Sequence, residues 1–337
     1  MEPGSCLPSQ NTLVRDLLSH FRCTGSTTLT ETTKSWVFVA KDTVFKLKKQ
    51  VRDELQDLTP LRARHDNTLT EIDLNRRLAP DMYLGAVRVG RMDDGRLVLD
   101  NRAAETVDWL VRMRRLPADR MLDALIGAGT PKAELSRALG PLVPMLANFY
   151  RTASATRLGA ADLMTVQEDQ LAMARDVLLH PQFRDLRPRV KRVLGKLEAS
   201  WPELAQMLSE RVQQEAIVEC HGDMRPEHIC LTDPPVIYDC LEFNRTLRLS
   251  DPYSELVFLG MECGVLGAPW IGRELIAGLE AHLGTAPRPA LLRIYEALHA
   301  VVRARLCLAH LLQPIPRTPR KWMPLGLQYL DVAERSL

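Results

Sequence analysis

Short runs rich in β-branched and aromatic residues, bounded by polar breaks, occur in the first third of the chain, which predicts β-strands there. Runs with strand character lie at 36–40, 43–49, 83–89, 96–99 and 109–113. A two-residue polar break separates the first two runs, and this pattern is typical of a hairpin. Helical spacing of apolar residues occurs at 12–22 and 61–78, and the second of these patterns stops just before Pro80.

Beyond Pro117 the pattern changes to long helical segments. These are predicted at 160–179, 190–208 and 291–312, with strand character only near 216–220, 228–231 and 236–238. A proline-rich stretch at 314–324 predicts a surface loop before a last helix. Strands followed by helices indicate an α+β protein with two lobes, which we expect at 1–113 and 114–337.

Composition narrows the class of protein. The 337 residues carry a formal net charge of +2, which gives no excess positive field for nucleic acid. No secretory signal is visible at the start, and no uncharged run is long enough to span a membrane. The seven cysteines form no framework of paired spacings, as is typical of reduced thiols. We therefore expect a cytoplasmic protein without nucleic acid or membrane partners; its oligomeric state cannot be read.

Residues that can take part in catalysis or bind a metal ion are densest at 220–230 and 236–239. Each half is a short apolar strand that leads polar side chains into a turn. The first half holds His221, Asp223 and His228, and the second ends at Asp239. Phosphoryl transfer needs a carboxylate to orient the attacking hydroxyl and further groups to hold the cation on the phosphates. This spacing is typical of such a site.

The same residues resemble the aminoglycoside phosphotransferase and choline kinase superfamily, whose loop reads His-Gly-Asp, with Asn five residues after the Asp and a later metal-binding Asp. Residues 36–49, 71–80 and 111–117 are similar to bacterial aminoglycoside-phosphotransferase-like proteins of unassigned substrate. The resemblance implies a protein-kinase-like fold, with a small antiparallel-sheet lobe and a larger helical lobe. It also implies transfer of the γ-phosphate of ATP to a hydroxyl of a sugar, amino sugar or amino alcohol.

Roles in the helical lobe follow from the resemblance position by position. Asp223 corresponds to the catalytic Asp, Asp239 to the principal metal ligand, and His228 to the Asn that also binds metal. Asp251 resembles an Asp that braces the catalytic loop. His221 reads better as structural support of that loop than as a catalytic group.

Roles in the first lobe follow in the same way. Lys46 resembles the strand lysine that contacts the nucleotide phosphates, and Glu71 resembles the helix glutamate that pairs with it. Because strand side chains alternate, Lys48 faces the same side as Lys46 and is the alternative. Arg112 and Met113, at the expected lobe boundary, are assigned to nucleotide binding by the resemblance.

Two departures from the family pattern bear on the cofactors. The loop expected to cover the nucleotide, at 24–35, offers only Gly25, so its backbone contacts to phosphate are less assured. His228 brings an imidazole where Mg²⁺ prefers oxygen ligands, and Mn²⁺ accepts nitrogen more readily. We therefore expect ATP with Mg²⁺ or Mn²⁺.

Two other functions remain open. A nucleotide-binding pseudokinase, or interaction module without turnover, would account for His228 and the glycine-poor loop. A zinc protein would use the Cys and His residues between 220 and 240, because thiolate and imidazole are usual zinc ligands. Against zinc, Cys220 and His221 are strand neighbours that point to opposite faces, and the Cys-x₂₋₄-Cys spacing is absent.

Overall fold

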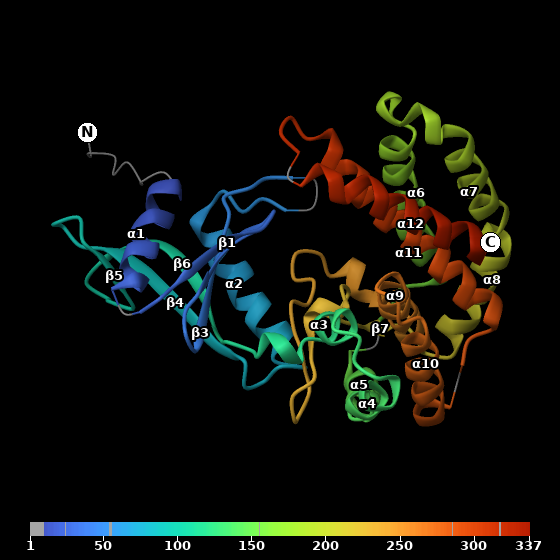
Figure 1. Ribbon diagram of the computed structural model, residues 1–337, viewed down its shortest axis with the longest axis horizontal. Coiled ribbons are helices and arrows are strands. Elements are labelled where there is room, and N and C mark those ends of the chain that lie inside the picture. The colour runs from blue at the N-terminus through green and yellow to red at the C-terminus, as the bar shows by residue number, and fades with distance from the viewer. Residues whose placement is uncertain (1–9, 24, 54–55, 155, 285, 317) are drawn as a thin grey trace. The chain divides into compact units, whose positions relative to one another are not determined.

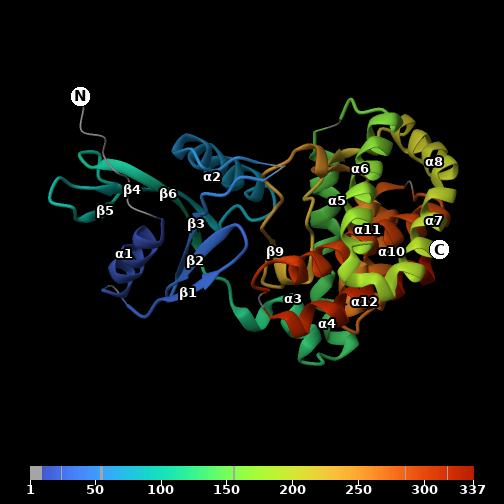
Figure 2. The same cartoon turned by 90° about the horizontal axis from the view of Figure 1, so that it is seen from above.

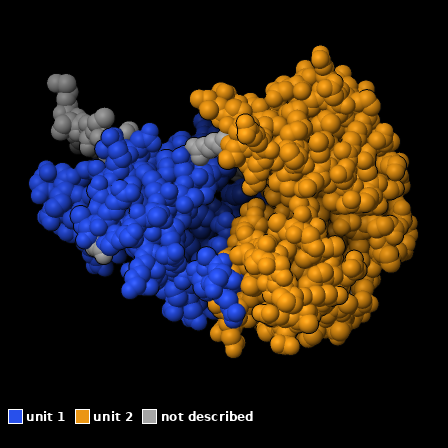
Figure 3. Space-filling view, in the orientation of Figure 1, with its two compact units in different colours: residues 1–120, 236–244 blue, residues 121–235, 245–337 orange. Residues whose placement is uncertain are grey.

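The computed structural model describes residues 10–23, 25–53, 56–154, 156–284, 286–316 and 318–337. The chain forms two compact units (Figure 3). Unit 1 comprises residues 1–120 and 236–244, and unit 2 comprises residues 121–235 and 245–337. A sheet-based unit and a larger helical unit confirm the predicted α+β class. The short segment 236–244 belongs to unit 1, although it interrupts unit 2 in the sequence.

Unit 1 is built on one antiparallel sheet of six strands in the order β1-β2-β3-β6-β4-β5 (Figure 1). The strands are β1 (Thr28–Glu31), β2 (Ser35–Val39), β3 (Thr43–Lys48), β4 (Tyr83–Arg91), β5 (Leu97–Leu99) and β6 (Glu105–Arg114). The predicted hairpin is confirmed as β2 and β3, in which Val37 lies opposite Lys46. Unit 1 also holds the two-residue strand β9 (Val236–Ile237).

Two helices cover opposite faces of this sheet, α1 (Gln10–Arg22) and α2 (Leu61–Asn75) (Figures 1 and 2). Leu17 of α1 packs with Leu47 of β3 in one apolar cluster, whereas Ile72 of α2 packs with Val44 in another. The alternation of side chains along a strand therefore decides which residues of β3 meet α2.

A buried ion pair attaches α2 to the sheet. The Arg64 Nε lies 2.9 Å from Asp108 Oδ1, and both side chains are almost completely buried. Arg64 also donates through Nη1 to the carbonyl oxygens of Leu58 and Thr59. A buried guanidinium with this set of acceptors fixes both the position of the helix and the loop that leads into it.

Unit 2 is mainly helical. Its α-helices are α3 (Leu122–Gly127), α4 (Lys132–Leu139), α5 (Leu142–Thr152), α6 (Ala160–Leu178), α7 (Arg187–Ala199), α8 (Trp201–Gln213), α9 (Pro252–Val265), α10 (Trp270–Leu283), α11 (Pro289–Ala309) and α12 (Pro319–Ser336). Its short strands are β7 (Val218–Glu219), β8 (Ile229–Cys230) and β10 (Leu249–Ser250), of which β7 and β10 pair antiparallel. Buried residues of α6, α7, α8, α9, α11 and α12 form one apolar core.

The single helix predicted over 190–208 is wrong, because α7 and α8 are separate helices. The first ends at Ala199, and Ser200 donates through its hydroxyl to the carbonyl oxygen of Leu197 at 2.7 Å. Pro202 then occupies the first turn of α8. Proline has no amide hydrogen and cannot continue a helix, whereas it is well tolerated in a first turn.

The loop predicted over 314–324 is also partly wrong. Helix α12 begins at Pro319 and contains Pro324, so only the first part of the stretch precedes the helix. Pro319 lies where the amide hydrogen would lack a partner in any case. The expectations made for the first nine residues, and for positions 24 and 317, lie outside the described residues. Within the described part of the chain, no helix has the length and apolar character needed to cross a membrane.

Helices α9 and α10 approach each other closely at two glycines. A Cβ placed on Gly260 would lie 2.6 Å from the Gly272 Cα, and one placed on Gly272 would lie 2.7 Å from the Gly260 Cα. The atoms met are backbone atoms, which cannot rotate away. The helix crossing therefore requires glycine at both positions.

We predict that Gly272→Ala lowers the free energy of unfolding by about 1–3 kcal/mol, since the added methyl forces the two helices apart. Gly195→Ala is the matched control, because a Cβ at this exposed position in α7 meets nothing within 4 Å. The control should stabilise by about 0.5–1 kcal/mol through helix propensity. Urea denaturation of both variants measures the difference, and equal effects would contradict the close crossing.

Candidate functional site

The Lys46 ammonium lies between two carboxylates of unit 1. Its Nζ is 2.9 Å from Glu71 Oε1 on α2 and 2.7 Å from Asp239 Oδ1 in the segment 236–244. The Glu71 side chain is fully buried, Lys46 is 15% exposed and Asp239 is 38% exposed. The structure thus brings together three residues that the sequence singled out, and the exposure of the network increases toward Asp239.

Lys48, the alternative to Lys46, faces the same side of β3 but has other contacts. It pairs with Glu71 and with Glu242, and its side chain is 1% exposed. Lys46 is the more accessible of the two lysines, and it is the one that contacts Asp239. The sequence left this choice open because strand alternation alone puts both side chains on one face.

The charge of Lys46 is stabilised by its surroundings. Burial opposes this charge, but the carboxylates of Asp239 and Glu71 outweigh burial and raise the pKa of Lys46 well above its usual value. Burial likewise favours the neutral form of Glu242, yet Lys48 and Lys46 lower its pKa overall. Lys46 therefore stays an ammonium and Glu242 stays a carboxylate at neutral pH.

The segment that carries Asp239 is held on α2 and β4 by its backbone. Cys240 donates its amide hydrogen to Asn75 Oδ1 at 2.8 Å, and the Asp239 amide donates to the Tyr83 hydroxyl at 3.4 Å. Asp239 adopts a φ of 61°, in the left-handed region that residues with a Cβ rarely occupy. Such a conformation persists only where neighbouring contacts determine it, and it is common at functional sites.

Arg112 and Met113 lie side by side on β6 but differ in environment. Met113 is buried in the cluster between the sheet and α2, whereas Arg112 is exposed. Opposite them on β3 stand Val44 and Phe45. Their assignment to nucleotide binding remains a prediction.

In unit 2, a loop at 220–225 leads into a 3-10 helix at Pro226–His228, and helix α9 fixes the start of the loop. Glu255, in the first turn of α9, accepts the amide hydrogens of His221 at 3.2 Å and Gly222 at 2.6 Å. The Tyr150 hydroxyl also donates to Glu255 at 2.8 Å. His221 is buried, and its Nδ1 accepts the amide hydrogen of Asp223 at 3.3 Å. Asp223 itself is 33% exposed.

Asp251 lies at the N-terminal end of the same helix. Its carboxylate accepts from the amide of Tyr253 at 3.0 Å, and it forms a two-point ion pair with Arg211 at 2.6 and 3.1 Å. The Tyr295 hydroxyl donates to it at 3.3 Å. These contacts fix the start of α9, and through Glu255 they fix the loop that carries Asp223.

Arg225 connects the polar side chains of this loop. Its Nε lies 3.1 Å from Asp223 Oδ1, and its Nη1 donates to Glu227 at 2.7 Å. Its Nη2 lies 3.0 Å from His228 Nε2, while His228 Nδ1 lies 2.8 Å from the backbone oxygen of Asp223. A guanidinium only donates, so Nε2 accepts and Nδ1 carries the hydrogen. Both ring nitrogens of His228 are therefore engaged.

The two residues expected to bind metal differ in how well they fit a cation. The Asp239 carboxylate is partly exposed and offers the oxygen donors that Mg²⁺ prefers. His228 is buried, and its accepting nitrogen already faces Arg225, so it reaches a cation only if Arg225 withdraws. Among the described residues, no group of three or more His, Cys, Asp or Glu is arranged to hold a metal ion.

The predicted site residues fall into two sets. Lys46, Glu71 and Asp239 come together in unit 1, and Asp223, His228, His221 and Asp251 belong to unit 2. Sequence reasoning missed Arg225 and Glu255. An acidic residue four positions after Asp251, in a run that is mostly apolar apart from it and Glu262, was the available signal for Glu255.

Solved kinases share this fold. Choline kinase LicA from Streptococcus pneumoniae matches over 96% of this chain and 97% of its own, with a TM-score of 0.54 and 11% identity. A choline/ethanolamine kinase family protein from Mesorhizobium loti covers 93% and 88%, with a TM-score of 0.52 and 16% identity. Spectinomycin phosphotransferase APH(9)-Ia, in complex with ADP and spectinomycin, covers 92% of each chain, with a TM-score of 0.51 and 11% identity. The predicted kinase-like fold is confirmed.

Relatives found by sequence are more similar in sequence to this chain than the solved kinases are, but they carry no described activity. Uncharacterized proteins of Mycobacterium tuberculosis and Mycobacterium bovis are each 29% identical over 286 residues, which is 82% of this chain. These matches cover 53% of the relatives, so the chain spans about half the length of the curated relatives it matches. No protein-family profile matches the chain.

We predict that Lys48→Met lowers the free energy of unfolding more than Lys46→Met does. Lys48 pairs with both Glu71 and Glu242, so its removal takes a cation away from two carboxylates. Loss of one partner of a buried ion pair typically lowers the free energy of unfolding by about 3–5 kcal/mol. Removing Lys46 leaves Glu71 paired with Lys48 and leaves Asp239 in contact with solvent. Chemical denaturation at pH 7 ranks the two variants; a larger loss for Lys46→Met would contradict these contacts.

Proposed function

We propose that the chain is an ATP-dependent phosphotransferase that moves the γ-phosphoryl group to a hydroxyl of a sugar, amino sugar or amino alcohol. The observation that carries the proposal is the Lys46 ammonium held between Glu71 and Asp239. Lys48 on the same strand also pairs with two carboxylates, but neither of them is as exposed as Asp239. A lysine that pairs with the partly exposed Asp239 is suited to contact phosphate oxygens beside a cation bound by the same carboxylate.

Each residue has a distinct part in this reaction. Lys46 would bind phosphate oxygens of ATP, and Glu71 holds Lys46 in position. Asp239 would hold Mg²⁺ or Mn²⁺, which neutralises charge on the phosphates when bound. Asp223 would orient the acceptor hydroxyl and take its proton as the oxygen bonds to the γ-phosphorus and ADP leaves. Arg225 holds the Asp223 carboxylate, and Glu255 fixes the backbone that carries it.

Similarity to solved kinases supports the nucleotide and the chemical class of the acceptor. The spectinomycin phosphotransferase was solved with ADP, and the choline kinases are named for an amino alcohol. We extend both features to this chain as part of the proposal. A screen of ATP consumption over sugars, amino sugars, amino alcohols and nucleosides, with Mg²⁺ and Mn²⁺ in separate series, tests it.

A second candidate function is nucleotide binding without turnover. The observation that favours it is that Arg225 occupies both the Asp223 carboxylate and the His228 ring nitrogen. In such a protein ATP would bind, yet no acceptor in the screen would increase ATP consumption. Turnover with any acceptor excludes this second function.

We predict that Asp223→Asn leaves the dissociation constant for ATP nearly unchanged and lowers acceptor-dependent turnover by roughly 10²- to 10⁴-fold, the usual cost of losing a positioned base. Asp185→Asn is the matched control, because that side chain is 95% exposed and belongs to no predicted site. Calorimetry with ATP and a coupled ADP assay provide the two measurements. Unchanged turnover in Asp223→Asn would remove Asp223 as the base.

We predict that His228→Asn leaves the dependence of turnover on Mg²⁺ and Mn²⁺ unchanged but lowers the melting temperature. The shorter amide cannot keep the contacts to Arg225 and to the Asp223 carbonyl oxygen at the same time, and together these contacts hold the loop. Metal titrations of both proteins, with thermal melts alongside, check this expectation. If His228→Asn instead needs less Mg²⁺ for half-maximal turnover and shows a smaller Mn²⁺ advantage, then His228 is a metal ligand.

A further inference from the structure

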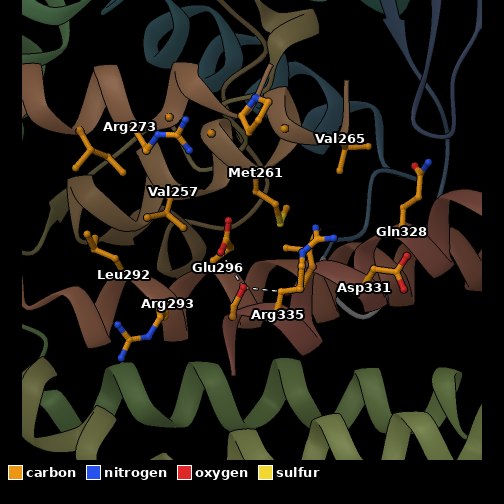
Figure 4. A pocket seen from close by; sticks show the side chains of 17 residues that line it. Val257, Met261, Val265, Arg273, Leu292, Arg293, Glu296, Gln328, Asp331 and Arg335 are labelled. Atoms are coloured by element: carbon orange, nitrogen blue, oxygen red, sulfur yellow. Dashed lines mark hydrogen bonds between the residues drawn. The ribbon is translucent and has the colours of Figure 1, made fainter. Parts of the chain in front are cut away.

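Unit 2 contains a cavity of about 660 Å³ among α9, α10, α11 and α12 (Figure 4). Its volume lies within the range of about 300–1,000 Å³ that is typical of small-molecule sites. None of the residues assigned above to phosphoryl transfer lines it. The cavity is therefore separate from the predicted catalytic residues and needs its own explanation.

Apolar side chains from all four helices line much of the cavity. They are Val257 and Met261 of α9, Ile276 of α10, Leu292 of α11 and Val332 of α12. Gly260, Gly264 and Gly272 also line it and contribute no side chains. The close crossing of α9 and α10 at Gly260 and Gly272 thus brings two helices together without filling this space.

Arginine side chains also line the cavity. They are Arg273 of α10, Arg293 of α11 and Arg335 of α12. In the view of Figure 4, Met261 lies between Arg273 and Arg335. Within the described ranges, neither of these two guanidinium groups has a hydrogen bond or an ion pair. A guanidinium beside an apolar surface favours an anion with a flat, two-oxygen edge.

The carboxylates of the cavity are already engaged with other groups. Glu296 accepts a hydrogen bond from the Ser336 hydroxyl at 2.7 Å, and Asp331 pairs with Arg189, which does not line the cavity. Arg189 offsets the charge of Asp331, whereas the Ser336 hydroxyl is neutral and does not offset that of Glu296. Because Arg273, Arg293 and Arg335 outnumber this one carboxylate, the lining has a net positive charge.

We propose that this cavity binds a small amphipathic anion, with a carboxylate or phosphate head at Arg273 or at Arg335 and an apolar body on Val257, Met261 and Ile276. Both parts of the ligand have a counterpart in the lining. The head forms charge-assisted hydrogen bonds with a guanidinium group, and the body removes apolar surface from water. The site is independent of the proposed phosphotransferase reaction.

Isothermal titration calorimetry of the full chain with four probes tests the proposal. Octanoate and octyl phosphate carry the two kinds of head, octan-1-ol carries the apolar body alone, and acetate carries the head alone. The variant Arg273→Gln/Arg335→Gln removes both charges while keeping polar, exposed side chains. Arg184→Gln is the control, since this exposed arginine of unit 2 does not line the cavity.

We expect octanoate or octyl phosphate to bind at least about tenfold more tightly than octan-1-ol and acetate, and the tighter of the two identifies the head. The double variant should weaken that binding by about tenfold or more, as loss of charge-assisted hydrogen bonds implies, and Arg184→Gln should not. The proposal is overturned if neither anion binds, if octan-1-ol binds as tightly as the anions, or if the double variant binds like the unmodified protein.

Discussion

The arrangement of unit 1 depends on the buried carboxylate of Glu71. A carboxylate removed from water must be compensated by cations, and here two lysines of one strand provide the charge. Because Lys46 and Lys48 are two residues apart, both reach the α2 face of the sheet. The same lysines pair with Asp239 and Glu242, about 190 residues further along the chain. One charge network therefore joins the sheet, its helix and a distant segment.

Helix α9 has the corresponding part in unit 2. Asp251 caps its N-terminus and pairs with Arg211, and Glu255 in its first turn accepts two backbone hydrogens of the loop before Asp223. The side chains of Val257 and Met261, four residues apart, lie on another face and line the cavity. A single helix thus supports the candidate catalytic loop on one side and a separate ligand site on another, so its position is constrained by both.

The sequence predicted what depends on local periodicity. Strand alternation placed Lys46 and Lys48 on one face, and the structure has them there. Strand alternation could not show which lysine is the more accessible, because that depends on their contacts with Asp239 and Glu242, which are remote in sequence. Glu255 was missed for a related reason, because the role of an acidic residue in a mostly apolar helical run becomes clear only when its hydrogen-bond donors are known. Between 190 and 208, the helical spacing of apolar residues continues from α7 into α8. This pattern hid the end of one helix and the start of the next at Pro202.

The spacing of the loop identified the position of His228 but not its contacts. Position five after Asp223 suggested a metal ligand, and the imidazole made that ligand unusual for Mg²⁺. The contacts follow from Arg225, three residues earlier. Its guanidinium can only donate, so it donates a hydrogen bond to His228 Nε2. The other nitrogen then donates to the Asp223 carbonyl oxygen. An Asn amide oxygen at this position could also accept from Arg225, but its shorter side chain could not bridge both groups. Histidine at 228 is thus explained by its length and its two nitrogens, which connect Arg225 to the backbone of the residue it pairs with.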